Sequence, residues 1–123
     1  MTTTTNQKMS FTVTNFDNDL DRVAVPLALA NNALAMGHDV LVWLTLEGVQ
    51  LAKEKAANAL VPKSFPPIQQ LINTFVENGG KFGVCPPCAK THGVTDDNLI
   101  DSAEWMGAAA LLEANQDRQT AWF

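Results

Sequence analysis

The chain has 123 residues, 46% of them hydrophobic and 17% charged, which is the size of one domain with a larger apolar share than most soluble domains carry. Its 13 Asp and Glu outnumber 8 Lys and Arg, and no basic cluster interrupts the net charge of −5, so we expect no nucleic-acid partner. Because no apolar run has the length of a membrane span or the pattern of a signal peptide, we expect no membrane association and a cytoplasmic location, where the two cysteines would be thiols or take part in catalysis.

The N-terminal part of the chain predicts a leader and then a strand. Residues 1–8 are rich in threonine, and we expect them to form a flexible leader ahead of one folded domain that spans residues 9–123. Within residues 9–15, the Phe, Val and Thr side chains are typical of a β-strand. The aspartates and the asparagine that follow favour a loop, so the first strand should end before them.

A helix and a buried strand are predicted next. Apolar residues recur on one helical face over residues 21–36, and Gly37 follows at the position where many helices end. Pro26 has no backbone N–H, so we expect it in the first turn of this helix or at a kink. Residues 40–46 are apolar without alternation, as in a strand of a parallel sheet that helices cover on both faces.

The middle of the chain predicts two helices and a third strand. Residues 49–61 are rich in Ala and Lys and favour a short helix followed by a loop. From Ile68 onwards apolar residues repeat with helical spacing until Gly79 stops the pattern, which predicts a second main helix. The short run over residues 81–85 then predicts a strand that ends at Cys85.

The C-terminal third continues the alternation of helices and strands. One or two helical turns are predicted over residues 86–92, a strand over 103–107, a helix over 108–116 and a fifth strand over 118–123. Strands that alternate with helices on short connections indicate an α/β layered domain with a mostly parallel sheet.

Chemistry in such a fold gathers at the carboxyl ends of the strands, where loops converge. Asn15 follows the first predicted strand, Glu47 and Gly48 follow the second, and Cys85 ends the third. A cysteine that opens a helical turn faces unpaired backbone N–H groups and the positive end of the helix dipole, which favour the thiolate. We therefore expect Cys85 to be a reactive thiol, with Asn15, Glu47 and Gly48 as supporting residues.

The second cysteine, Cys88, lies three residues after Cys85, so a helical turn would bring both sulfurs to the same side. The pair could form a reversible disulfide, or Cys88 could resolve a persulfide on Cys85. Both could equally be buried and inert, as free cysteines often are. His92 could join the pair around a metal ion, but structural zinc takes four protein ligands and no second Cys/His pair exists. We expect neither a metal nor another cofactor.

Both histidines have a structural interpretation. His38 follows Gly37 at the amino edge of the sheet, away from Cys85, and is expected to be a surface turn residue. His92 is near the thiols and could tune them or move a proton, although a histidine at a helix end more often satisfies the last carbonyl groups. We therefore treat His92 as a supporting residue of the site.

Several segments together resemble the DsrE/DsrF-like family, whose members include subunits of bacterial sulfur relays. The order of these segments is more specific than any one of them, and they span nearly the whole chain after the leader. The segments are residues 15–22, 29–38, 46–51, 84–93 (VCPPCAKTHG) and 106–111.

The resemblance implies a three-layer α/β/α fold with a five-stranded, mainly parallel sheet, and assembly into homotrimers or homohexamers. In relay members a single cysteine at the end of a central strand carries sulfane sulfur as a persulfide and passes it to a partner protein, and Cys85 matches that position. Those subunits carry a small residue other than cysteine where this chain has Cys88.

The leading functional hypothesis is a sulfur-relay protein or sulfurtransferase that carries sulfane sulfur on Cys85. Its partners would be sulfur donor and acceptor proteins or small polysulfides. One alternative is a thiol–disulfide oxidoreductase that uses Cys85 and Cys88 together. Another is a non-enzymatic oligomeric assembly or regulatory protein with incidental cysteines.

Overall fold

The computed structural model describes residues 6–123 as a five-stranded sheet in which every strand pairing is parallel, with helices on both faces. This confirms the α/β fold class. Most of the predicted leader, residues 1–5, lies outside the described residues, and the first strand begins at Lys8. In chain order the elements are β1 (Lys8–Val13), α1 (Leu20–Ala35), β2 (Asp39–Leu44), the 3₁₀ helices η1 (Leu46–Ala52) and η2 (Ala56–Ala59), α2 (Ile68–Glu77), β3 (Lys81–Val84), α3 (Pro86–Thr91), β4 (Ala103–Trp105), α4 (Ala108–Ala114) and β5 (Gln119–Trp122).

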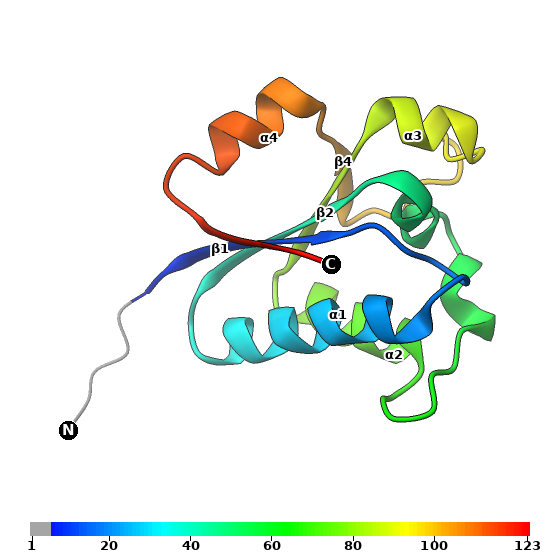
Figure 1. The fold of residues 1–123 in the computed structure, drawn as a ribbon, viewed down its shortest axis with the longest axis horizontal. Helices are drawn as coiled ribbons and strands as arrows, with labels where there is room; N and C mark the ends of the chain where they lie inside the picture. The colour runs from blue at the N-terminus through cyan, green and yellow to red at the C-terminus, as the bar shows by residue number, and fades with distance from the viewer. Residues whose placement is uncertain (1–5) are drawn as a thin grey trace.

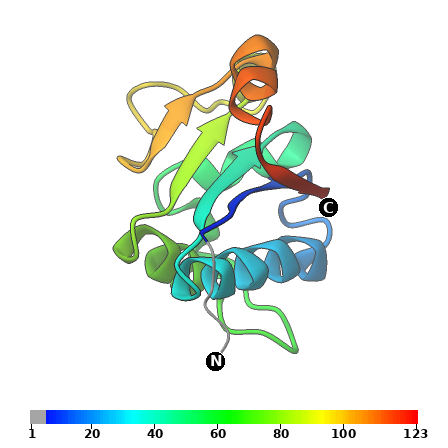
Figure 2. The ribbon, with the colours of Figure 1, turned by 90° about the vertical axis from the view of Figure 1, so that its left-hand side faces the viewer.

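The strand order is β4-β3-β2-β1-β5, so each parallel connection crosses one face of the sheet. Helices α1 and α2 lie together on one face, and α3 and α4 lie on the other, as Figures 1 and 2 show from two sides. Within residues 6–123, none of the helices is both long and apolar enough to cross a membrane.

Helix α1 begins after Asp19, whose side chain accepts a hydrogen bond from the backbone N–H of Arg22 at 3.2 Å. Pro26 lies inside this helix and is buried, so of the two places expected for it, the first turn is excluded. A proline at this position removes one hydrogen bond of the helix. The helix continues to Ala35 as the apolar pattern predicted.

The larger part of the core lies between the sheet and the α1/α2 face. Phe75 of α2 packs against Phe82 of β3 with their ring centroids 4.9 Å apart, and both side chains are fully buried. On the other face a smaller cluster joins Leu41, Trp43 and Leu111. The two sheet faces are therefore covered unequally, because α3 and α4 are shorter than α1 and α2.

The segment after β2 differs most from its prediction. β2 ends at Leu44, two residues earlier than expected, and the chain turns directly into the 3₁₀ helix η1 where a short α-helix was predicted from residue 49. Gly48 explains the tight path, since a Cβ atom at this position would collide with the backbone carbonyl of Val13. The turn thus lies directly against the end of β1.

His38 is buried and not a surface turn residue as the sequence suggested. Its side chain is only 8% exposed, and its Nδ1 atom accepts a hydrogen bond from the backbone N–H of Gln7 at 3.0 Å. The imidazole thereby ties the start of β1 to the start of β2, at the sheet edge opposite the cysteines.

Candidate functional site

The two cysteines lie at the carboxyl edge of the sheet, next to the end of β2. Leu44 and Val84 are paired residues at the ends of β2 and β3, so Thr45 and Cys85 leave the sheet side by side. The backbone N–H of Cys85 donates to the carbonyl oxygen of Leu44 at 3.0 Å and fixes this start of α3. Sheet register alone therefore brings the segment after β2 to the cysteine pair.

Helix α3 positions the second thiol. Pro86 and Pro87 occupy its first turn, where backbone N–H groups would have no partner inside the helix. The backbone N–H of Ala89 donates to the carbonyl oxygen of Cys85 at 3.0 Å, which closes the first helical turn. Cys88 is thereby directed back toward Thr45 and its sulfur lies 3.6 Å from the Thr45 hydroxyl oxygen.

Three hydrogen-bonding groups surround the Cys88 sulfur: the Thr45 hydroxyl, the backbone N–H of Leu46 and the Cys85 thiol. Burial by itself would raise the pKa of the Cys88 thiol, because it disfavours the charged form. The three hydrogen bonds stabilise the thiolate and together outweigh that effect, so the pKa of Cys88 is lowered from its usual value. The surroundings of Cys88 therefore favour its thiolate form.

Leu46 has an unusual backbone conformation at this site. Its φ of 51° lies in the left-handed region, which a branched side chain rarely adopts, and its side chain is exposed. Burial of the leucine side chain therefore does not explain the strain. The backbone N–H of Leu46 is one of the groups that lower the pKa of the Cys88 thiol.

An open pocket of about 320 Å³ gives access to Cys88. The imidazole Nε2 of His92 lies 3.7 Å from a carboxylate oxygen of Glu47, so these two predicted supporting residues meet in the pocket wall. The helix-end carbonyl oxygens of Cys88 and Ala89 accept from the backbone N–H of His92, each at 3.1 Å. The pocket is lined by Leu46, Glu47, Pro87, Cys88, Thr91 and His92.

Cys85 has a different environment from Cys88. Its side chain is partly buried and packs against apolar side chains of the core clusters on both sides of the sheet. Cys88 is also partly buried and packs against the larger cluster, but it lines the pocket as well. The two thiols therefore differ in that Cys85 contacts both core clusters and Cys88 has one side on the open pocket.

Two other predicted supporting residues do not act on the thiols directly. Asn15 bonds its neighbours, donating to Thr14 Oγ1 at 3.3 Å and accepting from the side chain of Asn18 at 2.8 Å. Gly48 shapes η1 through its close approach to β1. The sequence interpretation missed Thr45 and Leu46, although their place directly after β2 put them at the same sheet edge as Cys85.

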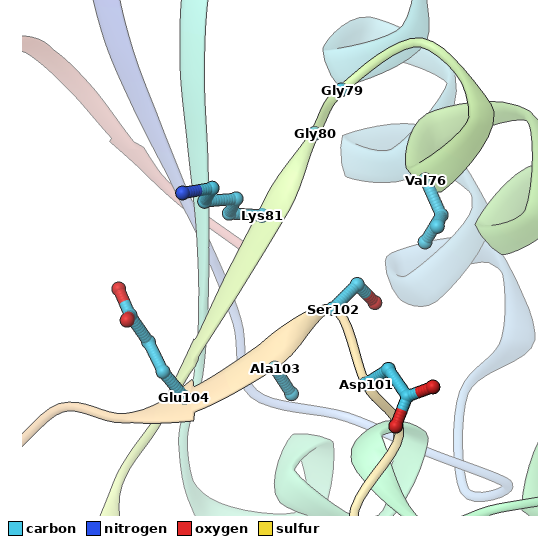
Figure 3. Close-up of a pocket in the computed structure, with 8 residues that line it drawn as sticks. All are labelled: Val76, Gly79, Gly80, Lys81, Asp101, Ser102, Ala103 and Glu104. Carbon is cyan, nitrogen blue, oxygen red and sulfur yellow. The ribbon is translucent and has the colours of Figure 1, made fainter.

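A second pocket has no cysteine in its lining. Figure 3 shows a pocket of about 310 Å³ at the amino ends of β3 and β4, at the edge away from the cysteines. Among the residues that the structure describes, no group of three or more His, Cys, Asp or Glu side chains is arranged to hold a metal ion. The pocket in Figure 3 is lined by Val76, Gly79, Gly80, Lys81, Asp101, Ser102, Ala103 and Glu104.

Sequence comparison shows the family to which the chain belongs. The chain matches the model of the DsrE/DsrF-like family over residues 7–121. It is 31% identical to the uncharacterized protein MK0008 of Methanopyrus kandleri over 84 residues, which cover 68% of this chain and 66% of that protein. It is 32% identical to the uncharacterized protein MJ0989 of Methanocaldococcus jannaschii over 98 residues, covering 78% of this chain and 82% of that protein.

Solved structures share the fold. The ychN protein from E. coli superimposes with a TM-score of 0.73 at 16% identity, covering 95% of this chain and 99% of that one. The protein of unknown function MTH1491 from Methanobacterium thermoautotrophicum gives a TM-score of 0.73 at 13% identity, covering 96% and 100%. At these identities the likeness establishes the fold alone.

Proposed function

Because the chain belongs to the DsrE/DsrF-like family, we propose that it accepts sulfane sulfur and carries it as a persulfide on Cys85. The observation that carries this proposal is the pair of hydrogen-bonded thiols at the carboxyl edge of the sheet, one in apolar surroundings and one beside an open pocket. A persulfide on Cys85 would have apolar neighbours from both core clusters, and a small donor can approach the pair through the pocket beside Cys88.

The loading step is a thiol exchange. The Cys85 sulfur, having lost its proton to solvent, attacks the outer sulfur of a donor persulfide or polysulfide. The bond between the two donor sulfurs breaks, its electron pair leaves with the donor thiolate, and a bond forms between Cys85 Sγ and the transferred sulfur. An acceptor thiolate removes that sulfur by the same exchange in reverse.

The partners in this proposal are sulfur donor and acceptor proteins or small polysulfides. Cytoplasm is the compartment that suits it, because acceptor thiols stay reduced there. A sulfur delivered through the pocket passes Leu46 and Pro87, whose side chains at the rim are apolar, and then the Cys88 sulfur. This lining fits a small, weakly hydrated sulfur species.

Thiol–disulfide exchange is the second candidate function, and the hydrogen bond between Cys85 and Cys88 favours it, because it holds the two sulfurs close together. A measurement of the redox potential of the Cys85–Cys88 pair distinguishes thiol–disulfide exchange from sulfur carriage. A dithiol too reducing to cycle with the cytoplasmic thiol pool would remove this candidate.

We also propose that the chain assembles as a homotrimer or homohexamer. Its support is a pair of large apolar side chains left exposed beside the smaller core cluster: Leu112, next to Leu111 on α4, is 70% exposed, and Trp122, whose ring centroid lies 5.9 Å from that of Trp43, is 61% exposed. Exposed aromatic and leucine side chains that gather on one part of a surface are typical of subunit contacts.

The experiment that tests the function loads purified Cys88→Ser protein with a small-molecule persulfide, removes the excess and measures the intact mass. Removing Cys88 leaves no second thiol to reduce the product. The expected result is a mass gain of one sulfur atom in Cys88→Ser and none in Cys85→Ser. If Cys88→Ser gains no sulfur, or Cys85→Ser gains as much, the proposal that Cys85 carries sulfur is wrong.

A further inference from the structure

We propose that Cys88 discharges a persulfide on Cys85, so that the site releases the sulfur as hydrosulfide and closes into a Cys85–Cys88 disulfide. This inference rests on the proposed function and adds the fate of the sulfur. It makes the protein a reductase of sulfane sulfur, with a dithiol that must be restored after each turnover.

The position of the two sulfurs supports the discharge. Cys85 is the residue directly before α3 and Cys88 lies in its first turn, so one helical turn carries both the attacking sulfur and the sulfur that it would attack. An attack within one site competes well with attack by a free acceptor, because the effective concentration of a neighbouring group far exceeds that of a dissolved partner. A persulfide on Cys85 that no bound acceptor protein removes is therefore discharged by Cys88.

The surroundings of Cys88 supply the charge for the attack. Thr45 and Leu46 belong to the segment after β2, not to α3, and their hydrogen bonds to the Cys88 sulfur do not depend on the Cys85 thiol. They persist when Cys85 becomes a persulfide and can no longer donate its own proton. The Thr45 hydroxyl oxygen lies 3.6 Å from the Cys88 sulfur.

Three titratable side chains lie on the pocket wall or on α3 near Cys88. Glu47 on η1 and His92 directly after α3 line the pocket with Cys88, and they contact each other at 3.7 Å. Lys90, on α3, is exposed. The hydrogen bonds from Thr45 and Leu46 are the short-range contacts that act on the sulfur itself.

The step balances as follows. Cys88 thiolate attacks Cys85 Sγ, the bond from Cys85 Sγ to the outer sulfur breaks, and the outer sulfur leaves with the electron pair as hydrosulfide. The outer sulfur is reduced, and the two cysteine sulfurs are oxidised to a disulfide. Two equivalents of a small-molecule thiol, or one dithiol, then reduce the disulfide and are themselves oxidised to a disulfide.

The test treats reduced protein with one equivalent of a small-molecule persulfide and measures released sulfide, intact mass and disulfide content over time. We expect wild type to release sulfide and lose two hydrogens, while Cys88→Ser keeps the added sulfur. Thr45→Val should release sulfide about three- to tenfold more slowly near neutral pH, because loss of the hydrogen bond lowers the fraction of Cys88 that is thiolate. The loss is only partial, because a Cys88 thiol of higher pKa is a stronger nucleophile once it is deprotonated. Thr120→Val, an exposed threonine on β5, is the matched control and should release sulfide at the wild-type rate.

The outcomes separate this inference from the proposed function. If wild type keeps the added sulfur as stably as Cys88→Ser does, the inference is wrong and the carrier function stands. If neither protein gains sulfur nor releases sulfide, the proposed function fails. If Cys85→Ser takes up the sulfur and Cys88→Ser does not, Cys88 is the first acceptor and both proposals are overturned.

Discussion

The two cysteines differ in the donors that reach them, although only Pro86 and Pro87 separate them in the chain. Cys88 receives hydrogen bonds from a hydroxyl and a backbone N–H that belong to another element, and Cys85 packs among apolar side chains. A hydrogen bond to a charged group is worth more than one to a neutral group, so these donors act mainly on the thiolate. The chemical asymmetry of the pair therefore comes from the fold and not from the CxxC spacing.

Thr45→Val tests this asymmetry at the residue where it originates. The variant keeps the shape of the side chain and removes the hydroxyl, so the pKa of Cys88 should rise toward its usual value. At a given pH below the pKa less thiolate is present, and the pH midpoint of Cys88 alkylation moves upward. Alkylation by iodoacetamide at a series of pH values, with the Cys88 peptide identified by mass, measures it. An unchanged midpoint in Thr45→Val, equal to that of the Thr120→Val control, would show that the hydroxyl does not stabilise the thiolate.

At the residue level the sequence identified the cysteine pair, because Cys85 and Cys88 are close in the chain and their helical spacing is a local property. Thr45 and Leu46 escaped the prediction because their contact with Cys88 depends on the register of β2 against β3. His38 was wrongly placed at the surface for a related reason, because its hydrogen-bond partner Gln7 lies 31 residues earlier and is brought to it by the pairing of β1 with β2. Contacts between elements are set by packing, which a single sequence does not encode locally.

Among the elements, η1 links the site to the sheet. It starts at the left-handed Leu46, and Gly48 lets it pass against the end of β1. The Ala/Lys composition of residues 49–61 favours an α-helix, but the close approach at Gly48 requires a tighter path. The 3₁₀ helix is therefore a case in which tertiary packing overrides local preference.

Gly48→Ala tests this link between the elements. The added methyl group would collide with the Val13 carbonyl, and the backbone shift it forces should reduce the free energy of unfolding by about 1–3 kcal/mol. Urea denaturation measures the loss. Gly107→Ala is the matched control, because a Cβ atom there meets nothing within 4 Å, and it should cost less than about 1 kcal/mol. Equal losses in the two variants would contradict the close approach at Gly48.

The whole molecule has one well-covered and one lightly covered sheet face. The alternation of strands and helices predicted the α/β class and the number of strands, because hydrophobic periodicity reports which segments are buried. It did not reveal that Trp105 and Trp122 remain exposed, since a tryptophan in a strand has the same pattern whether its own chain or a second copy covers it. The exposed apolar side chains beside α4 and β5 are the basis for the proposed assembly.

Trp122→Lys tests the assembly. A buried lysine in a subunit contact loses its hydration without a partner, so the variant should shift the protein toward the monomer. Light scattering coupled to size-exclusion chromatography gives the mass in solution. Val61→Lys is the matched control, because Val61 has the same exposed fraction of 61% but lies in the loop after η2. A monomeric wild type, or equal dissociation of both variants, would contradict an interface at this face.

The most direct test of the central claim locates the added sulfur. Cys88→Ser protein is loaded with a small-molecule persulfide, the persulfide is capped by alkylation, and the protein is digested so that each peptide mass can be measured. The account predicts one extra sulfur atom on the peptide that contains Cys85, and on no other peptide. A Cys85 peptide without added sulfur after this treatment would contradict it.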